Sequence, residues 1–227
     1  GLITYDLSKK VGYALGKSLK KEAPILIGRD PRDSGYIILD AIKDGLNLAN
    51  KNIIDVGICP TPAVPFLIKR CGCSSGIMIS ASHNPPEYNG IKIFDQNGKK
   101  LKRIYEKNLE HSIQQKIKLD STSIHNNENI NNPSLLKFYE DSLIDSMGNE
   151  NLEGIKIILD TCHGSATSCA EKVFKKLGAN IKVINSQADG LKINVNCGST
   201  CLDPIKKAVK ENSADIGFSF DGDADRV

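Results

Sequence analysis

Three aspartates alternate with other residues in the segment DGDADR, residues 221–226, directly after the apolar stretch Ile216 to Phe220. Alternate residues of an extended segment share one face, so Asp221, Asp223 and Asp225 would bring their charges together. At about 4 Å and an effective dielectric of roughly 20, each like-charged pair costs on the order of 4 kcal/mol. A hard cation held by oxygen ligands, Mg²⁺ above all, would compensate this repulsion.

Other interpretations of this acidic segment fit less well. An EF-hand calcium loop requires Gly at its sixth position, where Arg226 stands, and a later Glu that the chain lacks. The haloacid-dehalogenase pattern requires Thr or Val where Asp225 stands. A solvated acidic turn is the alternative that involves no metal.

A polar loop, SASHNPP at residues 80–86, follows the apolar stretch that ends at Ile79. Open α/β sheets bind ligands at the carboxyl ends of their strands, which makes Ser82 a candidate nucleophile. A hydrolase dyad of Ser82 and His83 fits less well, because sequence neighbours seldom orient a base onto a hydroxyl and no GxSxG elbow is present. A hydrophilic connection capped by Ser and Asn is the structural alternative.

A lysine lies ten residues beyond this serine, in the segment NGIK that ends at Lys92. A strand lysine is usually only a solvated edge charge. Close to a phosphoester, however, Lys92 could serve as acid or base once its pKa falls.

Apolar periodicity predicts the elements that would position these loops. Helices alternate with short apolar runs, which is typical of α/β units with right-handed crossovers. The expected strands of the first part are Ile25 to Ile27, Asn52 to Val56, Gly76 to Ser80 and Ile91 to Phe94, and the expected helices are Leu7 to Lys20, Tyr36 to Leu48, one after Thr61-Pro62, and Arg103 to Lys116.

The segment Leu119 to Asn132 is rich in Ser, Thr and Asn and is expected to be a linker or surface loop. A second series of elements follows it. Its expected strands are Ile155 to Leu159, Asn180 to Ile184 and Asp215 to Phe220, and its helices begin behind Pro133-Ser134, at Ser165 (to Leu177) and at Asp203 (to Lys210). We therefore predict two consecutive three-layer α/β domains with mixed, mostly parallel sheets, residues 1–132 and 133–227, the second incomplete.

Composition excludes several functional classes. The 227 residues are 40% hydrophobic and 25% charged, as in globular domains, and the formal charge of +3 is too balanced for nucleic-acid binding. The longest apolar run, Ala63 to Ile68, is far shorter than the roughly twenty residues of a membrane helix. We expect a cytoplasmic protein with no nucleic-acid or membrane partner, and reduced thiols at its seven cysteines.

Taken together, the segments SASHNPPEYNGIK and FDGDADRV resemble the two signatures of the α-D-phosphohexomutase superfamily. The segment GRDPRDSG, residues 28–35, is similar to that family's GRDxRxSG loop. Within the superfamily, DGLKIN at 189–194 and NCGST at 196–200 most resemble the bacterial phosphoglucosamine mutases. Phosphomannomutase/phosphoglucomutase is the alternative.

This resemblance implies a phosphoserine at Ser82 that exchanges its phosphoryl group with a hexose or hexosamine phosphate through a bisphosphate intermediate. One Mg²⁺ per chain would be held by Asp221, Asp223, Asp225 and a phosphoserine oxygen at Ser82, with Arg226 steadying the same phosphate. The remaining candidates are Lys92 or His83 for proton transfer, and Arg29 and Asn84 for phosphate or substrate binding.

The superfamily also carries a GTxGxRG-like opening loop, a GExSG sugar-recognition loop and an RxSGTEP phosphate-binding loop, which this sequence lacks. We therefore expect an N-terminal fragment that is inactive by itself and whose partners are the C-terminal domains of a parent chain. A non-catalytic, Mg²⁺-dependent phosphosugar-binding or regulatory module is the alternative from a different class.

Overall fold

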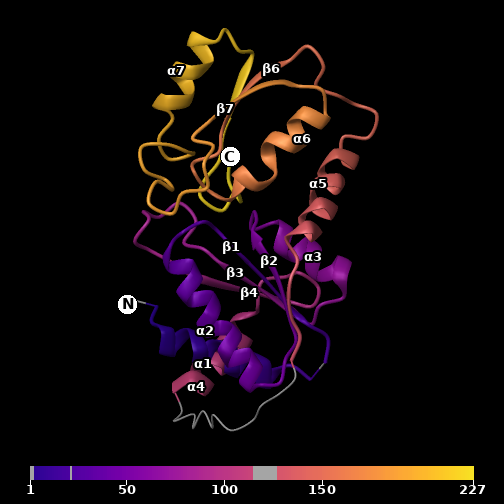
Figure 1. The fold of residues 1–227 in the computed structure, drawn as a ribbon, viewed down its shortest axis with the longest axis vertical. Coiled ribbons are helices and arrows are strands. Elements are labelled where there is room, and N and C mark those ends of the chain that lie inside the picture. The colour runs from indigo at the N-terminus through magenta and orange to yellow at the C-terminus, as the bar shows by residue number, and fades with distance from the viewer. Residues whose placement is uncertain (1–2, 21, 115–126) are drawn as a thin grey trace.

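The computed structural model describes residues 3–20, 22–114 and 127–227. They form two β-sheets that follow one another along the long axis of the molecule, each covered by helices (Figure 1). Residues 115–116 of the expected helix and 119–126 of the expected linker lie outside the described residues.

The first sheet has the strand order β4-β3-β1-β2-β5, in which the described strands run parallel except for β4. Its strands are β1 (Ile25–Arg29), β2 (Ile53–Ile58), β3 (Ser75–Ile79), β4 (Ile91–Asp95) and β5 (Asn129–Asn131). The helices of this part are α1 (Tyr5–Ser18), α2 (Ser34–Leu48), α3 (Ala63–Cys71) and α4 (Arg103–Gln114).

Strand β1 shows why this domain has three layers. Successive side chains of a strand point to opposite faces, and all five residues of β1 are buried. Ile25 and Ile27 pack in one apolar cluster with residues of α1 and α2, whereas Leu26 packs in a second cluster with residues of α3. The sheet is therefore covered on both faces, which explains its continuous apolar strands.

The second sheet is parallel and has the order β7-β6-β8. Ile157 and Leu159 of β6 pack with Ala166 and Ala170, and the intervening Ile158 packs with residues of α7, so this domain also has three layers. Its elements are η1 (Pro133–Leu135), α5 (Leu136–Asp145), β6 (Lys156–Asp160), η2 (Ser165–Ser168), α6 (Ala170–Lys176), β7 (Asn180–Ile184), α7 (Asp203–Glu211) and β8 (Ile216–Ser219). The predicted fold class, consecutive three-layer α/β domains with mostly parallel sheets, is confirmed.

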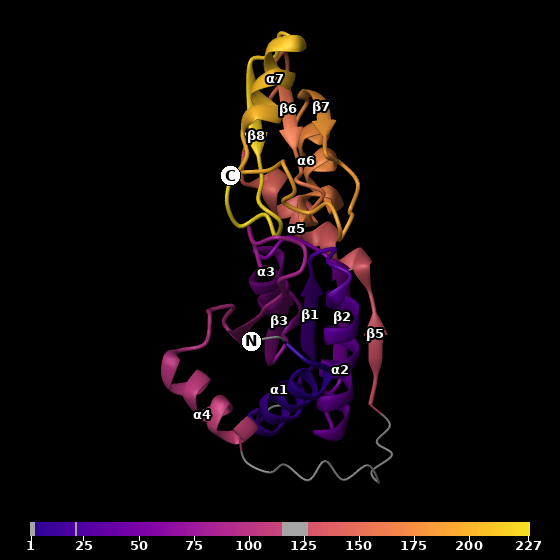
Figure 2. The ribbon, with the colours of Figure 1, turned by 90° about the vertical axis from the view of Figure 1, so that its left-hand side faces the viewer.

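Helix α5 runs beside the junction of the two sheets (Figure 2). It contacts α3 of the first domain and α6 of the second. Leu136 joins the apolar cluster of α3, and the Tyr139 ring meets Phe66 edge to face at 5.9 Å between centroids. Because α5 packs against helices of both domains, its packing does not assign it to either one. The predicted domain boundary after Asn132 therefore stays a prediction.

Two of the expected elements were wrong. Asn129–Asn131, expected in a linker, forms the edge strand β5, which pairs in parallel with β2. Its side chains are exposed, because an edge strand needs only its backbone groups to join the ladder. The helix expected from Ser165 to Leu177 is interrupted at Cys169, whose φ of −141° is not helical and separates η2 from α6.

Two expectations about the chain as a whole can be compared with the structure. All seven cysteines are free thiols. Among the described residues, none of the helices is both long and apolar enough to cross a bilayer.

A close contact between α1 and α2 yields a prediction about stability. A Cβ at Gly45 of α2 would overlap the backbone oxygen of Lys9 and lie 2.7 Å from the Tyr13 nitrogen. We expect Gly45→Ala to lower the free energy of unfolding by about 1–3 kcal/mol through overpacking, measured by urea denaturation. Gly35→Ala, in the same helix with its nearest atoms at 3.8 Å, is the control and should cause no loss. Equal losses of unfolding free energy in both variants would show that the close contact at Gly45 does not determine the effect.

Candidate active site

The candidate site forms where the carboxyl ends of the two sheets meet. The loop after β3 carries Ser82, and the loop after β8 carries the three aspartates. The Ser82 hydroxyl donates a hydrogen bond of 2.7 Å to Asp221 Oδ2. Residues 139 positions apart in the sequence are thus brought together by the placement of parallel strand ends.

Ser82 has an unusual backbone conformation. Its φ of 55° lies in the left-handed region, which residues with a Cβ rarely occupy and which is concentrated at functional sites. Its backbone N–H donates to Ser80 Oγ at 2.8 Å, and Ser80 Oγ donates to the buried Asp30 at 2.7 Å. The loop of Ser82 is therefore held in a strained shape by a chain of buried polar groups.

Arg32 holds the loop that contains Ser82 through hydrogen bonds to its backbone. This residue was not predicted from the sequence. Its side chain is fully buried and forms an ion pair of 2.9 Å with Asp30 Oδ2. The guanidinium also donates to backbone carbonyls of the loop, those of Ser82 (2.9 Å), Asn84 (2.7 Å), Pro85 and Tyr88 (2.9 Å). Burial raises the pKa of the Asp30 carboxyl, and the charge of Arg32 opposes that rise.

The acidic loop 221–226 has the geometry of a cation site. One carboxylate oxygen from each of Asp221, Asp223 and Asp225 lies within 4.8 Å of the other two. Asp221 Oδ1 accepts the backbone N–H groups of Asp225 and Arg226, both at 3.2 Å, which closes the loop. A Cβ at Gly222 would lie only 2.6 Å from the Ser82 carbonyl oxygen, so this position requires glycine if the two loops are to approach.

Only one of the two carboxylate oxygens of Asp223 has hydrogen-bond partners in the described part of the chain. Its Oδ2 accepts from Thr61 Oγ at 2.5 Å and from Lys92 Nζ at 2.5 Å. Its Oδ1 is buried and has no hydrogen-bond partner among the described residues. A buried carboxylate oxygen without a partner is costly unless a cation completes it, so these oxygens suit a hard divalent ion.

The charges of the site shift the pKa values of its members in different directions. Burial raises the pKa of Asp221, and the charges of Asp223 and Asp225 add to this rise. Burial would also raise the pKa of Asp223, but hydrogen bonds from Lys92 and Thr61 reverse the shift, so that its pKa is lowered. The acidic loop is thus not a set of three equivalent carboxylates.

Lys92 shifts in the opposite direction to the sequence expectation. Burial lowers its pKa, but its hydrogen bonds to Asp223 and to Asp225 (3.0 Å) raise it by more, so the net pKa is raised. The expectation of a lowered pKa was made without these two partners. In this arrangement Lys92 is an ammonium group that can donate a proton.

Arg226 and His83 have exposed side chains beside Ser82. The Arg226 guanidinium donates to Ser82 Oγ and lies 3.3 Å from Asp221 Oδ2. It also donates to His83 Nδ1 at 2.6 Å. A guanidinium can only donate, so Nδ1 of His83 accepts and the ring proton is on Nε2 of this exposed side chain.

Arg29 and Asn84 do not reach Ser82 with their side chains. The Arg29 guanidinium lies over the Tyr36 ring, 3.8 Å from its centroid, and its Nε is buried without a partner in the described part of the chain. The side-chain amide of Asn84 donates to the Ala81 carbonyl at 2.8 Å and so shapes its own loop. Their predicted roles in phosphate or substrate binding stay predictions.

Thr61 is a second residue that sequence reasoning missed. Its backbone N–H donates to the Asp223 carbonyl at 2.8 Å, in addition to the hydroxyl contact with the same residue. The only signal in the sequence was its position, since the loop after β2 leaves the same edge of the sheet as Ser82. That signal does not specify a partner 162 residues away.

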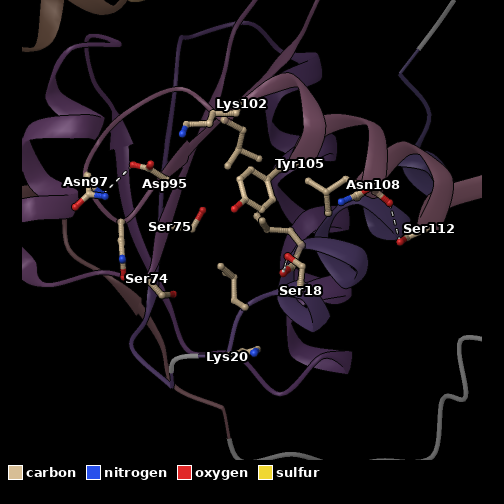
Figure 3. Close-up of a pocket in the computed structure, with 15 residues that line it drawn as sticks. Ser18, Lys20, Ser74, Ser75, Asp95, Asn97, Lys102, Tyr105, Asn108 and Ser112 are labelled. Carbon is tan, nitrogen blue, oxygen red and sulfur yellow. Dashed lines mark hydrogen bonds between the residues drawn. The ribbon is translucent and has the colours of Figure 1, made fainter.

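A groove of about 740 Å³ lies elsewhere on the first domain (Figure 3). Ser75, at the start of β3, and Tyr105 of α4 line it, with the Tyr105 side chain pointing into the opening. Because Ser75 begins β3 and Ser82 follows its carboxyl end, the groove and Ser82 lie at opposite ends of this strand. None of the predicted site residues lines this groove.

The chain matches the family description "phosphoglucomutase/phosphomannomutase, alpha/beta/alpha domain I" over residues 1–120 and the corresponding domain II over residues 137–227. It therefore belongs to the phosphoglucomutase/phosphomannomutase family. Relatives named phosphoglucosamine mutase include one from Prochlorococcus marinus subsp. pastoris, 62% identical over 99% of this chain and 50% of its own length. Another, from Parasynechococcus marenigrum, is 45% identical over 97% of this chain and 48% of its own. The chain spans about half the length of these relatives.

Solved structures agree on the fold. A phosphoglucomutase/phosphomannomutase family protein from Burkholderia thailandensis is 26% identical, with a TM-score of 0.77, over 97% of this chain and 49% of its own. A Thermus thermophilus protein described as a candidate phosphomannomutase is 19% identical, with a TM-score of 0.81, over 99% of this chain and 52% of its own. At the lower identity the likeness concerns the fold alone.

The burial of Arg32 leads to a prediction. We expect Arg32→Met to lower the free energy of unfolding by about 3–5 kcal/mol, because it leaves the buried Asp30 without its counter-charge and several carbonyls without a donor. Urea denaturation measures the loss. Arg70→Met is the matched control, since Arg70 is exposed and its contact with the Phe138 ring is worth about 1 kcal/mol or less. Similar losses in both variants would contradict the supporting role of Arg32.

Proposed function

We propose that this chain forms the amino-terminal half of a phosphoglucosamine mutase, which interconverts glucosamine 6-phosphate and glucosamine 1-phosphate through a phosphoserine and a bisphosphate. The observation that carries this proposal is the buried, left-handed Ser82, whose hydroxyl donates to Asp221, one of a cluster of three aspartates from the other domain. The names of curated relatives that are 60–64% identical to this chain favour glucosamine phosphate over mannose or glucose phosphates. A sugar phosphate as substrate would place the enzyme in the cytoplasm.

The metal that fits the acidic loop is Mg²⁺. Asp221, Asp223 and Asp225 would hold it with an oxygen of phosphorylated Ser82, and the unpartnered Oδ1 of Asp223 supports this assignment. When bound, it would supply Lewis-acid stabilisation of charge on the phosphoryl oxygens. Because Lys92 already pairs with Asp223 and Asp225, the same carboxylates would be shared between the ion and the ammonium group.

The described side chains account for the transfer as follows. The phosphoryl group leaves Ser82 Oγ as a new P–O bond forms to the free hydroxyl of the sugar phosphate, and the other phosphate of the bisphosphate later returns to Ser82. Arg226 donates to Ser82 Oγ and so stabilises that oxygen when it departs. Lys92, protonated beside two carboxylates, and His83, with Nδ1 held by Arg226, are the groups placed to move the proton.

A direct test replaces the nucleophile in the complete enzyme. We expect Ser82→Ala to lower mutase kcat by at least about 10³-fold, because the covalent step is lost. The variant should still unfold cooperatively, since the hydroxyl contributes little packing, although the buried Asp221 loses one donor. Ser146→Ala, at the end of α5 and remote from the site, is the control. Turnover by Ser82→Ala close to that of the control would refute the phosphoserine mechanism and favour a binding or regulatory module.

Metal binding can be tested on this chain without turnover. We expect isothermal titration calorimetry to detect one weak Mg²⁺ site, tighter when Ser82 is phosphorylated, because the phosphate adds an anionic oxygen ligand. Asp223→Asn should weaken binding by about tenfold or more, whereas the exposed Asp145→Asn should not change it. Equal Mg²⁺ affinity in all forms would remove the acidic loop as the metal site.

A further inference from the structure

The segment DGLKIN, residues 189–194, has no role in the site described above. It nevertheless crosses the junction between the two domains. A Cβ at Gly190 would lie 2.5 Å from the Pro31 carbonyl oxygen and 2.6 Å from the Asp33 nitrogen, so its backbone touches the loop after β1. The segment ends at Asn194, which has a left-handed φ of 62° and follows the fully buried Ile193.

The side chain of Asn194 reaches the nucleophile loop. Its Nδ2 donates to the Ser82 carbonyl at 2.8 Å and to the Asn84 carbonyl at 2.9 Å. The Arg32 guanidinium donates to the same two carbonyls, at 2.9 Å and 2.7 Å. The carbonyls of Ser82 and of Asn84, two residues further on, are thus held from the first domain by Arg32 and from the second by Asn194.

The orientation of the Asn194 amide is fixed by its neighbours. Carbonyl oxygens only accept, so the amide nitrogen must face Ser82 and Asn84. The amide oxygen then faces Cys162, whose thiol donates to Asn194 Oδ1 at 3.0 Å. The contact with Cys197 and burial raise the pKa of Cys162, which keeps this thiol protonated as a donor.

Cys162 is itself held in place by the end of β6. Its backbone N–H donates to the buried Asp160 Oδ1 at 2.9 Å. A continuous path of hydrogen bonds therefore runs from Asp160 through Cys162 and Asn194 to Ser82. Each of its links is inside the second domain except the last, which crosses to the first.

We propose that Asn194 is a positioning residue for Ser82, which locks the nucleophile loop from the second domain by donating to the carbonyls of Ser82 and Asn84. This role rests on the proposed mutase function, for which it supplies the geometry of the nucleophile. A left-handed serine is unfavourable by itself and persists only where its surroundings over-determine it. Asn194 supplies constraints that Arg32 alone, from one side, does not.

The test compares two asparagines in the complete enzyme. Asn194→Asp keeps the shape but replaces the donor with a carboxylate that faces two carbonyl oxygens. Asn196→Asp adds the same charge two residues away, at an exposed position with the same left-handed backbone. We expect Asn194→Asp to lower kcat on the order of 10²-fold, as for a reacting group displaced by about 1 Å, with little change in KM for glucosamine 6-phosphate. Asn196→Asp should leave both unchanged. An unchanged kcat in Asn194→Asp, or an equal loss in Asn196→Asp, overturns the proposal.

A second measurement separates this proposal from the proposed function. Amide hydrogen exchange of residues 81–90 should accelerate in Asn194→Asp and not in Asn196→Asp, whether or not the wild-type enzyme turns over. If the wild-type enzyme had no mutase activity, the proposed function would be refuted, but the exchange comparison would still test whether Asn194 holds the Ser82 loop. Unchanged exchange in Asn194→Asp would overturn the role proposed for Asn194.

Cys162 provides variants that avoid changing Asn194, in case Asn194→Asp does not fold. Cys162→Ala removes the donor that orients the amide, and Cys162→Ser keeps an O–H donor. We expect the Ala variant to lower kcat and accelerate exchange of the loop, and the Ser variant to restore both toward wild type. Identical behaviour of the Ala and Ser variants would overturn the proposed path.

Discussion

The mutual repulsion of Asp221, Asp223 and Asp225 is the constraint on which the arrangement of the two domains depends. The first domain relieves it with three donors, the hydroxyls of Ser82 and Thr61 and the ammonium of Lys92. These donors come from the loop after β3, the loop after β2 and strand β4. No short motif contains all three, so the order of strands in the sheet is what concentrates them. The contacts that build the site are therefore also contacts between the two domains.

The junction also works because polar side chains from one loop are matched to backbone groups of the next. Arg32 is the clearest case, since a fully buried guanidinium is tolerated only when nearly all its donors find acceptors. It finds them in the carbonyls of a loop with no regular secondary structure. These carbonyl groups of the irregular loop are therefore hydrogen-bonded, as the carbonyl groups of a strand would be. The close approach of Gly222 to the Ser82 carbonyl oxygen leaves the loop little room to change its shape. A rigid loop would suit the phosphoryl transfer proposed for Ser82, because positioning supplies much of the effect in catalysis.

The sequence supported much of the fold and the centre of the site. Short continuous apolar runs marked β1, β3 and β6, and alternating aspartates marked the acidic loop, since both patterns are local. Strand β5 escaped because its exposed Asn and Ile side chains carry no burial pattern. Thr61, Arg32 and Asn194 were not predicted because each acts through partners far away in the sequence. The partner of Thr61 is 162 positions away, Ser82 is 50 positions from Arg32, and the partners of Asn194 are 110 and 112 positions away. The direction of the Lys92 pKa failed for the same reason: its two carboxylate partners are set by tertiary contact.

The separation of these partners along the chain has a consequence for synthesis on the ribosome. Arg32 and the carbonyls it holds are 50 to 56 residues apart, whereas Ser82 and Asp221 are 139 apart. At roughly 5–20 residues per second, Asp221 is made on the order of ten seconds after Ser82. During that interval the first domain can fold and shape the serine loop around Arg32, while the acidic loop does not yet exist. A nascent chain thus presents a shaped serine without its acidic partner, and acquires the complete centre only when β8 has been translated and docked.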